Sequence, residues 1–434
     1  MEMDYANPDR NAGSDFGGVT DYMIDYRWHD ESRAGKEYRI RDGIFNTLSM
    51  MNRGQDVTVA YLGGSITHQD SWRPATTRWL QSISRGAVRE VTIGLSGTCA
   101  DLAVCRIDRE ILIHQPDLIF IEYAVNGGAA KDMEGMLHKI WRKLPRTDVI
   151  FVYTATTAQY QNDYSKGRIP SFAAIYEQVA DHYGVPSVFF GYQAYDLYDQ
   201  GKLTLGAAQP EPGKILYTTD QVHMTADGGM LAASAIARSI LPQLRDLPED
   251  YRKKDHILTE STLDPLPWVD ADTSDDWGKM KFTGPWLDCS LDDRGEFKNF
   301  PYTGAYLKDF HKIFPKLTGT RAGGSSVTVR FRGRNIGVFE AGGQFSGALR
   351  VIVDGKELEN RIMLFNHFDS KLRHQYYFVP ELEEGEHVVT FILDENMPDK
   401  SVLQSRFPED KLYEKNEFYL GKILFTGQLL PMES

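Results

Sequence analysis

Short apolar runs alternate with amphipathic helical patterns over the first half of the chain. The apolar, β-branched runs cover residues 57–62, 91–95, 118–123, 149–153 and 187–190. Apolar positions recur at helical spacing in residues 75–84, 101–114, 133–144, 172–183 and 226–241. Continuously apolar strands that alternate with helices are typical of a parallel sheet covered on both faces. The pattern therefore predicts a three-layer α/β/α domain.

A different period governs the second half of the chain. Apolar and polar residues alternate in residues 327–332, 349–353 and 388–393, and helical spacing is nearly absent from 280 to 430. Asp354-Gly355 directly follows one alternating run, which is typical of a tight β-hairpin. These features predict an all-β sandwich domain of jelly-roll type.

The two patterns imply a domain organisation, since 434 residues exceed what one core usually serves. Residues 1–50 are polar with a short helical stretch near 43–51, and we expect them to form an N-terminal arm. Residues 51–243 form the α/β domain. A Pro-, Asp- and Lys-rich linker occupies 244–277, and the β-sandwich occupies 278–434.

The net charge, the cysteines and the first residues of the chain limit which partners, metal sites and cellular locations we expect. The net charge of −13 disfavours nucleic acid and anionic membrane surfaces as partners, although an acidic surface also serves solubility. The three cysteines show no spacing typical of a zinc site or of a disulfide framework, and we expect no metal. The first residues lack the basic and apolar regions of a signal peptide, so we expect a cytoplasmic protein; a chain whose signal had been removed would look the same.

A serine directly follows the first predicted strand. Gly63-Gly64-Ser65 sits between this strand and a helix, and ligands of an open parallel sheet bind at the carboxyl ends of its strands. A serine on such a turn is suited to nucleophilic attack, with nearby backbone N–H groups stabilising an oxyanion. A helix-capping serine or a phosphate-binding turn would use the same residues. The lysine of a P-loop is missing, and the sequence is not G-x-S-x-G.

Further polar groups follow the next two strands. Gly97 comes after the second strand, and its N–H could join an oxyanion site. Asn126 comes after the third strand, where its side-chain amide could donate to the same oxyanion. Each is also a common turn residue.

An Asp–His pair precedes the last helix of the α/β domain. Asp220 and His223 are three residues apart, so one tight loop can bring the carboxylate to the imidazole and orient it as a general base. A pair of this kind can arise by chance among 11 histidines. The order of serine, glycine, asparagine and Asp–His after successive strands is the more specific signal.

These blocks resemble those of the SGNH (GDSL-like) hydrolase superfamily. The flanking residues 57–67, 71–74 and 116–122 are similar to carbohydrate O-acetylesterases, several of which carry a jelly-roll accessory domain. The resemblance implies a flavodoxin-like sheet, a catalytic Ser65–His223–Asp220 triad, an oxyanion hole of Ser65, Gly97 and Asn126, and no cofactor. It departs from the family at Gly127, where aspartate is frequent, and at Cys99, where glycine is frequent.

The resemblance implies an acyl-serine mechanism that releases acetate from an acetylated oligo- or polysaccharide. We expect Trp72, Tyr160 and Tyr217 to be sugar contacts, or otherwise packed core aromatics. The β-domain would bind polysaccharide, wall the cleft, stabilise the first domain or form a homo-oligomer interface. A lipase, thioesterase or acyltransferase on the same scaffold, a non-catalytic glycan-binding protein and a phosphate-binding protein are the alternatives.

Overall fold

The computed structural model describes residues 35–259, 268–304, 306–365, 372–409 and 411–432. The chain forms two compact units, Met1–Val269 and Asp270–Ser434. The division falls inside the segment predicted as a linker. Most of the predicted N-terminal arm lies outside the described residues, while its last part belongs to the first unit.

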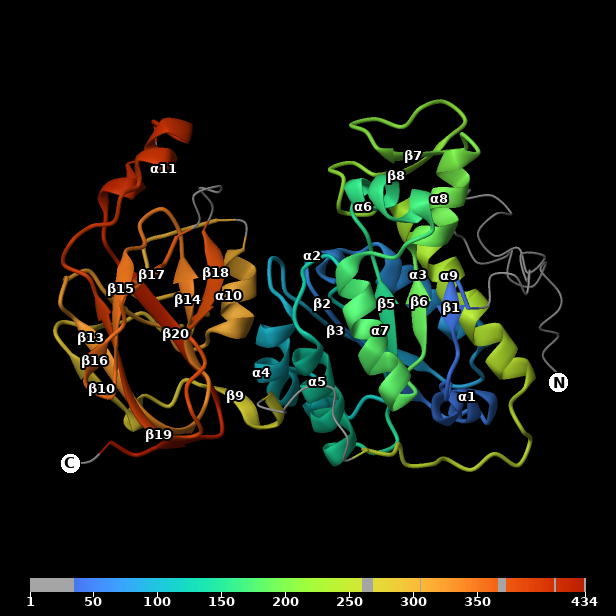
Figure 1. The fold of residues 1–434 in the computed structure, drawn as a ribbon, viewed down its shortest axis with the longest axis horizontal. Helices are drawn as coiled ribbons and strands as arrows, with labels where there is room; N and C mark the ends of the chain where they lie inside the picture. The colour runs from blue at the N-terminus through green and yellow to red at the C-terminus, as the bar shows by residue number, and fades with distance from the viewer. Residues whose placement is uncertain (1–34, 260–267, 305, 366–371, 410, 433–434) are drawn as a thin grey trace. The chain divides into compact units, whose positions relative to one another are not determined.

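A six-stranded sheet forms the centre of the first unit, in the order β1-β6-β5-β4-β2-β3 (Figure 1). Its parallel strands are β2 (Val57–Gly63), β3 (Val88–Gly94), β4 (Leu118–Glu122), β5 (Asp148–Tyr153) and β6 (Ser187–Phe189). The short strand β1 (Tyr38–Arg39) pairs antiparallel with β6. The chain passes from β2 out to β3 and then back to β4, which is the flavodoxin-like strand order. The fold prediction is confirmed.

Helices cover both faces of this sheet (Figure 1). The helices α3 and α9 pack together on one face, and α4, α5 and α7 pack in sequence on the other. A small parallel pair, β7 (Leu203–Gly206) and β8 (Ile215–Thr218), lies outside the main sheet. The helices are α1 (Phe45–Asn52), α2 (Ser65–His68), α3 (Trp72–Ile83), α4 (Ala100–Glu110), α5 (Ala130–Lys143), α6 (Thr157–Asn162), α7 (Ser171–Tyr183), α8 (Gly191–Asp199) and α9 (Ala226–Arg245).

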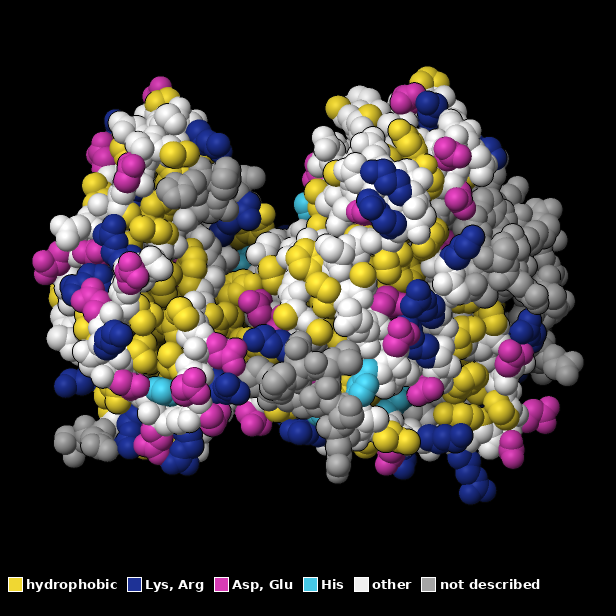
Figure 2. All heavy atoms as spheres, in the orientation of Figure 1, with side chains coloured by type: hydrophobic (Ala, Val, Ile, Leu, Met, Phe, Trp, Pro, Cys, Tyr) yellow, Lys and Arg dark blue, Asp and Glu magenta, His cyan; other side chains and the backbone are white. Residues whose placement is uncertain are grey.

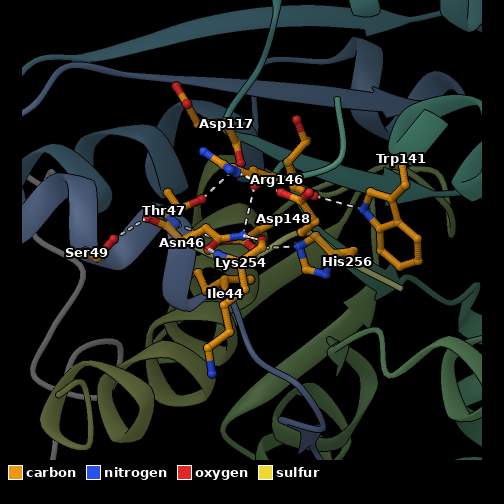
Figure 3. A network of polar contacts seen from close by, with 12 residues as sticks. Ile44, Asn46, Thr47, Ser49, Asp117, Trp141, Arg146, Asp148, Lys254 and His256 are labelled. Atoms are coloured by element: carbon orange, nitrogen blue, oxygen red, sulfur yellow. Dashed lines mark hydrogen bonds and ion pairs between the residues drawn. The ribbon is translucent and has the colours of Figure 1, made fainter. Parts of the chain in front are cut away.

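The segment that follows α9 is bound to the first unit by a polar network (Figure 3). The Asn46 side chain donates to the Lys254 carbonyl at 2.9 Å and accepts from the Lys254 N–H at 2.8 Å. The buried Asp148 carboxylate contacts the His256 ring, with 3.0 Å between Oδ1 and Nε2. This part of the predicted linker is therefore fixed to the N-terminal ends of the sheet strands.

The second unit is an antiparallel β-sandwich (Figure 1). One sheet has the order β10-β13-β19-β15-β16, with β17 on β15 and β21 on β13, and the other has the order β11-β12-β20-β14-β18, with β9 on β20. The strands are β9 (Ala271–Ser274), β10 (Met280–Thr283), β11 (Leu287–Asp288), β12 (Thr318–Thr320), β13 (Ser326–Gly333), β14 (Ile336–Gly342), β15 (Ala348–Val353), β16 (Lys356–Glu357), β17 (Ile362–Met363), β18 (Arg373–Phe378), β19 (Gly385–Leu393), β20 (Phe418–Thr426) and β21 (Gln428–Leu430). The predicted sandwich is confirmed, and two short helices, α10 (Leu307–Ile313) and α11 (Ser401–Arg406), accompany it.

Acidic and basic side chains are interspersed on the face of the molecule shown in Figure 2. On this face, therefore, the acidic side chains are not gathered into one region. Among the described residues, no helix has both the length and the apolar character needed to cross a membrane.

Candidate active site

Ser65 lies at the carboxyl end of the central sheet, as the first residue of α2. Strand β2 ends at Gly63, and Gly64 makes the turn into the helix. The turn is tightly packed, because a Cβ placed on Gly94, at the end of β3, would come within 2.3 Å of the His68 backbone N in α2. The nucleophile candidate therefore sits on a short helix pressed directly against the neighbouring strand.

His223 and Asp220 meet Ser65 in a continuous hydrogen-bonded chain. The His223 Nε2 atom lies 2.8 Å from Ser65 Oγ, and its Nδ1 atom lies 2.6 Å from Asp220 Oδ2. The other carboxylate oxygen, Asp220 Oδ1, accepts the His223 backbone N–H at 2.8 Å and that of Val222 at 3.1 Å. With Nδ1 donating to the carboxylate, Nε2 is left to accept the serine proton.

The electrostatics of Asp220 suit this arrangement. Burial opposes its ionisation, but the backbone and ring N–H groups of His223 and the N–H of Val222 outweigh burial and lower the pKa of the carboxyl. Asp220 is therefore ionised at neutral pH and can stabilise a protonated imidazole.

The loop that carries Asp220 and His223 is anchored at both ends. Gln221 has a φ of 72°, and its carbonyl accepts the N–H of Thr157 at 2.9 Å. Thr225 caps α9, since its side-chain oxygen accepts the N–H of Gly228 at 3.1 Å. These contacts fix the direction from which His223 approaches Ser65.

Asn126 is held beside the turn that presents Ser65. A Cβ on Gly64 would lie 2.0 Å from Asn126 Oδ1 and 2.9 Å from its Nδ2, so only glycine leaves room for this amide. The buried Oδ1 atom makes no hydrogen bond within the described part of the chain. The Cys99 thiol donates to the Asn126 backbone carbonyl at 3.0 Å, which gives the unusual cysteine a part in fixing this loop.

The other departure from the family pattern also has a local reason. Gly127 has a φ of 93°, and a Cβ there would lie 2.8 Å from the ring of Phe172. An aspartate would be strained at this φ and would collide with the ring. Glycine is therefore the residue that this pocket accepts at position 127.

Gly97 lies in the turn between β3 and α4 with a φ of 73°. The Thr98 hydroxyl donates to the Leu95 carbonyl at 2.8 Å and closes this turn. Gly97 thus follows its strand at the same sheet edge as Ser65 and Asn126. Its N–H as an oxyanion donor stays a prediction.

Comparisons with known proteins agree with this architecture. No protein-family model and no curated protein sequence matches the chain. Among solved structures, a two-domain esterase active on acetylated mannans, co-crystallised with mannopentaose, is 19% identical over 90% of this chain and 96% of that chain, with a TM-score of 0.64. A second structure of such a mannan-active esterase is 19% identical over 89% and 96%, with a TM-score of 0.63. An acetylxylan esterase mutant from Geobacillus stearothermophilus is 16% identical over 42% of this chain and 94% of that chain, with a TM-score of 0.33.

This chain has the two-domain fold of the mannan-active esterases. The similarity extends over most of both chains, so it includes the β-sandwich as well as the α/β unit. The resemblance inferred from the sequence blocks is confirmed at the level of the fold.

The predicted sugar contacts need a correction. Trp72, Tyr160 and Tyr217 are exposed by only 0%, 0% and 1%, and all three belong to the core of the first unit. Their rings pack against other aromatic side chains, such as Trp72 edge-on to Tyr61 and Tyr160 edge-on to Tyr217. None of these rings offers a face on which a sugar could stack, and the alternative interpretation as core aromatics describes them.

Sequence analysis missed two buried side chains next to the site. Arg73 binds the backbone carbonyls of Thr67 and His68 and the carboxylate of Glu90, and so fixes the segment that follows Ser65. Glu122, the last residue of β4, is buried beneath α2. A single acidic residue in an otherwise apolar run is the signal in the sequence that points to Glu122.

The described residues contain no group of three or more His, Cys, Asp and Glu side chains that could hold a metal ion. The polar groups that surround Ser65 are hydroxyl, imidazole, amide and carboxyl groups. Acid–base and nucleophilic chemistry is what such groups provide by themselves.

Proposed function

We propose that this protein is a serine esterase that removes O-acetyl groups from an oligo- or polysaccharide. The observation that carries the proposal is the hydrogen-bonded chain from Ser65 Oγ through His223 to Asp220. This arrangement activates a hydroxyl for attack on an acyl carbonyl, and it stands at the sheet edge where such folds bind ligands.

The reaction would proceed in two acyl-transfer steps. Ser65 Oγ attacks the ester carbonyl while His223 Nε2 takes the serine proton, and His223 then returns that proton to the departing sugar hydroxyl. Water, deprotonated by His223, attacks the acetyl-serine, and acetate leaves as His223 returns the proton to Ser65 Oγ. The N–H groups of Ser65 and Gly97 and the amide of Asn126 would stabilise both oxyanions.

The carbohydrate substrate is supported by the shared fold. The solved structures with this two-domain architecture are of an esterase active on acetylated mannans. The triad accounts for attack on an ester but does not determine which alcohol the ester contains. The acetylated glycan is therefore the part of the proposal that needs a substrate test. Cytoplasmic residence and assembly with a second copy remain further parts of the proposal.

Substitution of the nucleophile tests the mechanism. We expect Ser65→Ala to fold like the wild type and to lose nearly all hydrolysis of 4-nitrophenyl acetate, because no other hydroxyl is bonded to His223 Nε2 in the described structure. Circular dichroism and a thermal melt check the fold. Turnover close to that of the wild type would refute the assignment.

A substrate series tests the acyl group and the alcohol. We expect hydrolysis of 4-nitrophenyl esters to be fastest for acetate, and acetate release from acetylated mannan, xylan, xyloglucan or pectin oligosaccharides. Fastest cleavage of octanoate or longer esters would favour a lipase. Irreversible labelling of Ser65 by a fluorophosphonate would argue against a non-catalytic glycan-binding protein.

A further inference from the structure

Glu122 is a wholly buried acid that joins two loops at the candidate site. Its exposed fraction is 0%, and it ends strand β4. One carboxyl oxygen, Oε2, accepts the Thr67 hydroxyl at 3.1 Å, and the other, Oε1, accepts the Thr154 hydroxyl at 2.5 Å. Both acceptor oxygens are therefore used by hydroxyls that come from different elements.

The two threonines belong to the segments that carry and flank the nucleophile. Thr67 lies in α2, two residues after Ser65, and Thr154 directly follows β5. A Cβ on Gly63 would lie 2.2 Å from Thr67 Oγ1 and 2.7 Å from the Glu122 carbonyl oxygen, so α2 lies close against the ends of β2 and β4. Glu122 is therefore hydrogen-bonded directly to the helix that begins with Ser65.

The Glu122 carboxyl also interacts electrostatically with His223, the proposed general base. Burial raises the pKa of this carboxyl to about 7, while the hydroxyls of Thr154 and Thr67 and the charge of His223 act in the opposite direction. The other titratable groups that sense Glu122 are Tyr123 and Tyr176, whose pKa values burial raises well above neutrality. Among these groups, His223 is the one that becomes positively charged during the proposed reaction.

Asp220 by itself would stabilise a positive charge on His223 only weakly. Its side chain is 52% exposed, so water and salt screen its field. The Glu122 carboxyl is excluded from water, where a charge of the same size acts more strongly. If position 122 served only to fill the core, an apolar residue would suffice. It would also avoid the free-energy cost of removing a carboxyl group from water.

We propose that Glu122 is a positioning residue for the esterase reaction: by accepting the Thr67 and Thr154 hydroxyls it holds Ser65 in line with His223, and its carboxylate supports the imidazolium that forms during the reaction. The inference rests on the proposed function. It assigns Glu122 no contact with substrate.

The substitution Glu122→Gln tests both parts, because it keeps the size and one acceptor oxygen but removes the charge. We expect kcat to fall by roughly 10- to 100-fold with KM within about twofold, since a misplaced nucleophile impairs the chemical step more than binding. We expect the acid limb of the kcat/KM profile to move to lower pH by roughly half a unit, because the His223 imidazolium loses a neighbouring negative charge that stabilises it.

The substitution Thr67→Val provides a second test in a nearly isosteric variant. Loss of this donor raises the pKa of Glu122 and so reduces its negative charge near neutral pH. The acid limb should therefore move to lower pH, as in Glu122→Gln, while kcat falls severalfold. If Glu122→Gln does not fold, Thr67→Val and Thr154→Val carry the test. Glu134→Gln is the matched control, because Glu134 is also fully buried but accepts a hydrogen bond from Tyr183 between α5 and α7.

The outcomes separate this inference from the proposed function. Movement of the acid limb to lower pH in both Glu122→Gln and Thr67→Val, with no movement in Glu134→Gln, supports a positioning role. Unchanged kcat and acid limb in both variants, or the same shift in the Glu134 control, overturns it. If Ser65→Ala abolishes hydrolysis while Glu122→Gln matches the wild type, only this inference fails; if Ser65→Ala stays active, the proposed function fails.

Discussion

At the scale of single residues, the candidate site depends on where side chains are missing. Gly64 has a negative φ, at −82°, so the sign of φ does not by itself require glycine. What excludes a side chain there is the Asn126 amide, which occupies the space that a Cβ would fill. Gly64 therefore contributes to the site by letting Asn126 approach the serine turn.

The substitution Gly64→Ala should consequently behave as a mutation of Asn126. We expect kcat to fall by about 100- to 1000-fold, the range typical of losing one oxyanion donor, while the fold is retained. Steady-state kinetics on 4-nitrophenyl acetate measures this, and Asn126→Ala should give a similar loss that the double variant does not deepen. Gly278→Ala is the control, because a Cβ there would meet only Asp276 Oδ1, at 3.3 Å. Wild-type turnover in Gly64→Ala would contradict the placement of Asn126.

Residue chemistry made part of the site predictable. Ser65, Asp220 and His223 stand at strand ends and in a three-residue spacing that the sequence displays directly, and the structure brings these three side chains together. The prediction of Trp72, Tyr160 and Tyr217 as sugar contacts rests on their nearness to the motifs along the chain. Nearness along the chain does not reveal which face of an element points inward, and all three rings point into the core.

At the scale of elements, periodicity located the parallel strands but not their edges. The predicted strand at 57–62 corresponds to β2, while β3 begins at Val88, three residues before its predicted start. The two-residue strand β1 is too short to produce any period, and it exists because β6 offers an open edge for antiparallel pairing. Such pairing is a tertiary contact that a local pattern does not carry.

The polar network at the base of the sheet makes an element-scale prediction. Besides its contacts with Lys254, Asn46 donates to the Arg146 carbonyl at 3.0 Å, so one side chain joins α1, the start of β5 and the segment after α9 (Figure 3). We expect Asn46→Ala to lower the free energy of unfolding by about 2 kcal/mol, since several hydrogen bonds of a buried amide are lost. The kcat value at 25 °C should stay unchanged, because the network lies at the opposite ends of the strands from Ser65.

Denaturant unfolding and steady-state kinetics on the same preparations check this prediction. The exposed Asn162→Ala serves as the control and should match the wild type in both measurements. Wild-type stability in Asn46→Ala would show that the segment after α9 is not held by this contact. A loss of kcat without a loss of stability would show that the network influences the site.

At the scale of the whole molecule, each unit has its own core and sheet order. The change from helical to alternating periodicity predicted an α/β unit followed by a β-sandwich, and the structure confirms both. The order in which sandwich strands pair could not be predicted, because β9 and β20 join residues about 150 positions apart on contacts that no local pattern encodes. The predicted linker proved to be mixed, with part of it fixed to the first unit and β9 built into the second.

The proposed function requires four distant segments of the first unit to converge and make Ser65 a nucleophile. Reaction with a fluorophosphonate, followed by peptide mapping with mass spectrometry, tests it most directly, because the reagent marks a serine only where a base activates it. We expect a single adduct on Ser65 in the wild type and its loss in His223→Ala. An adduct on another serine, or labelling of Ser65 that is equally fast without His223, would contradict it.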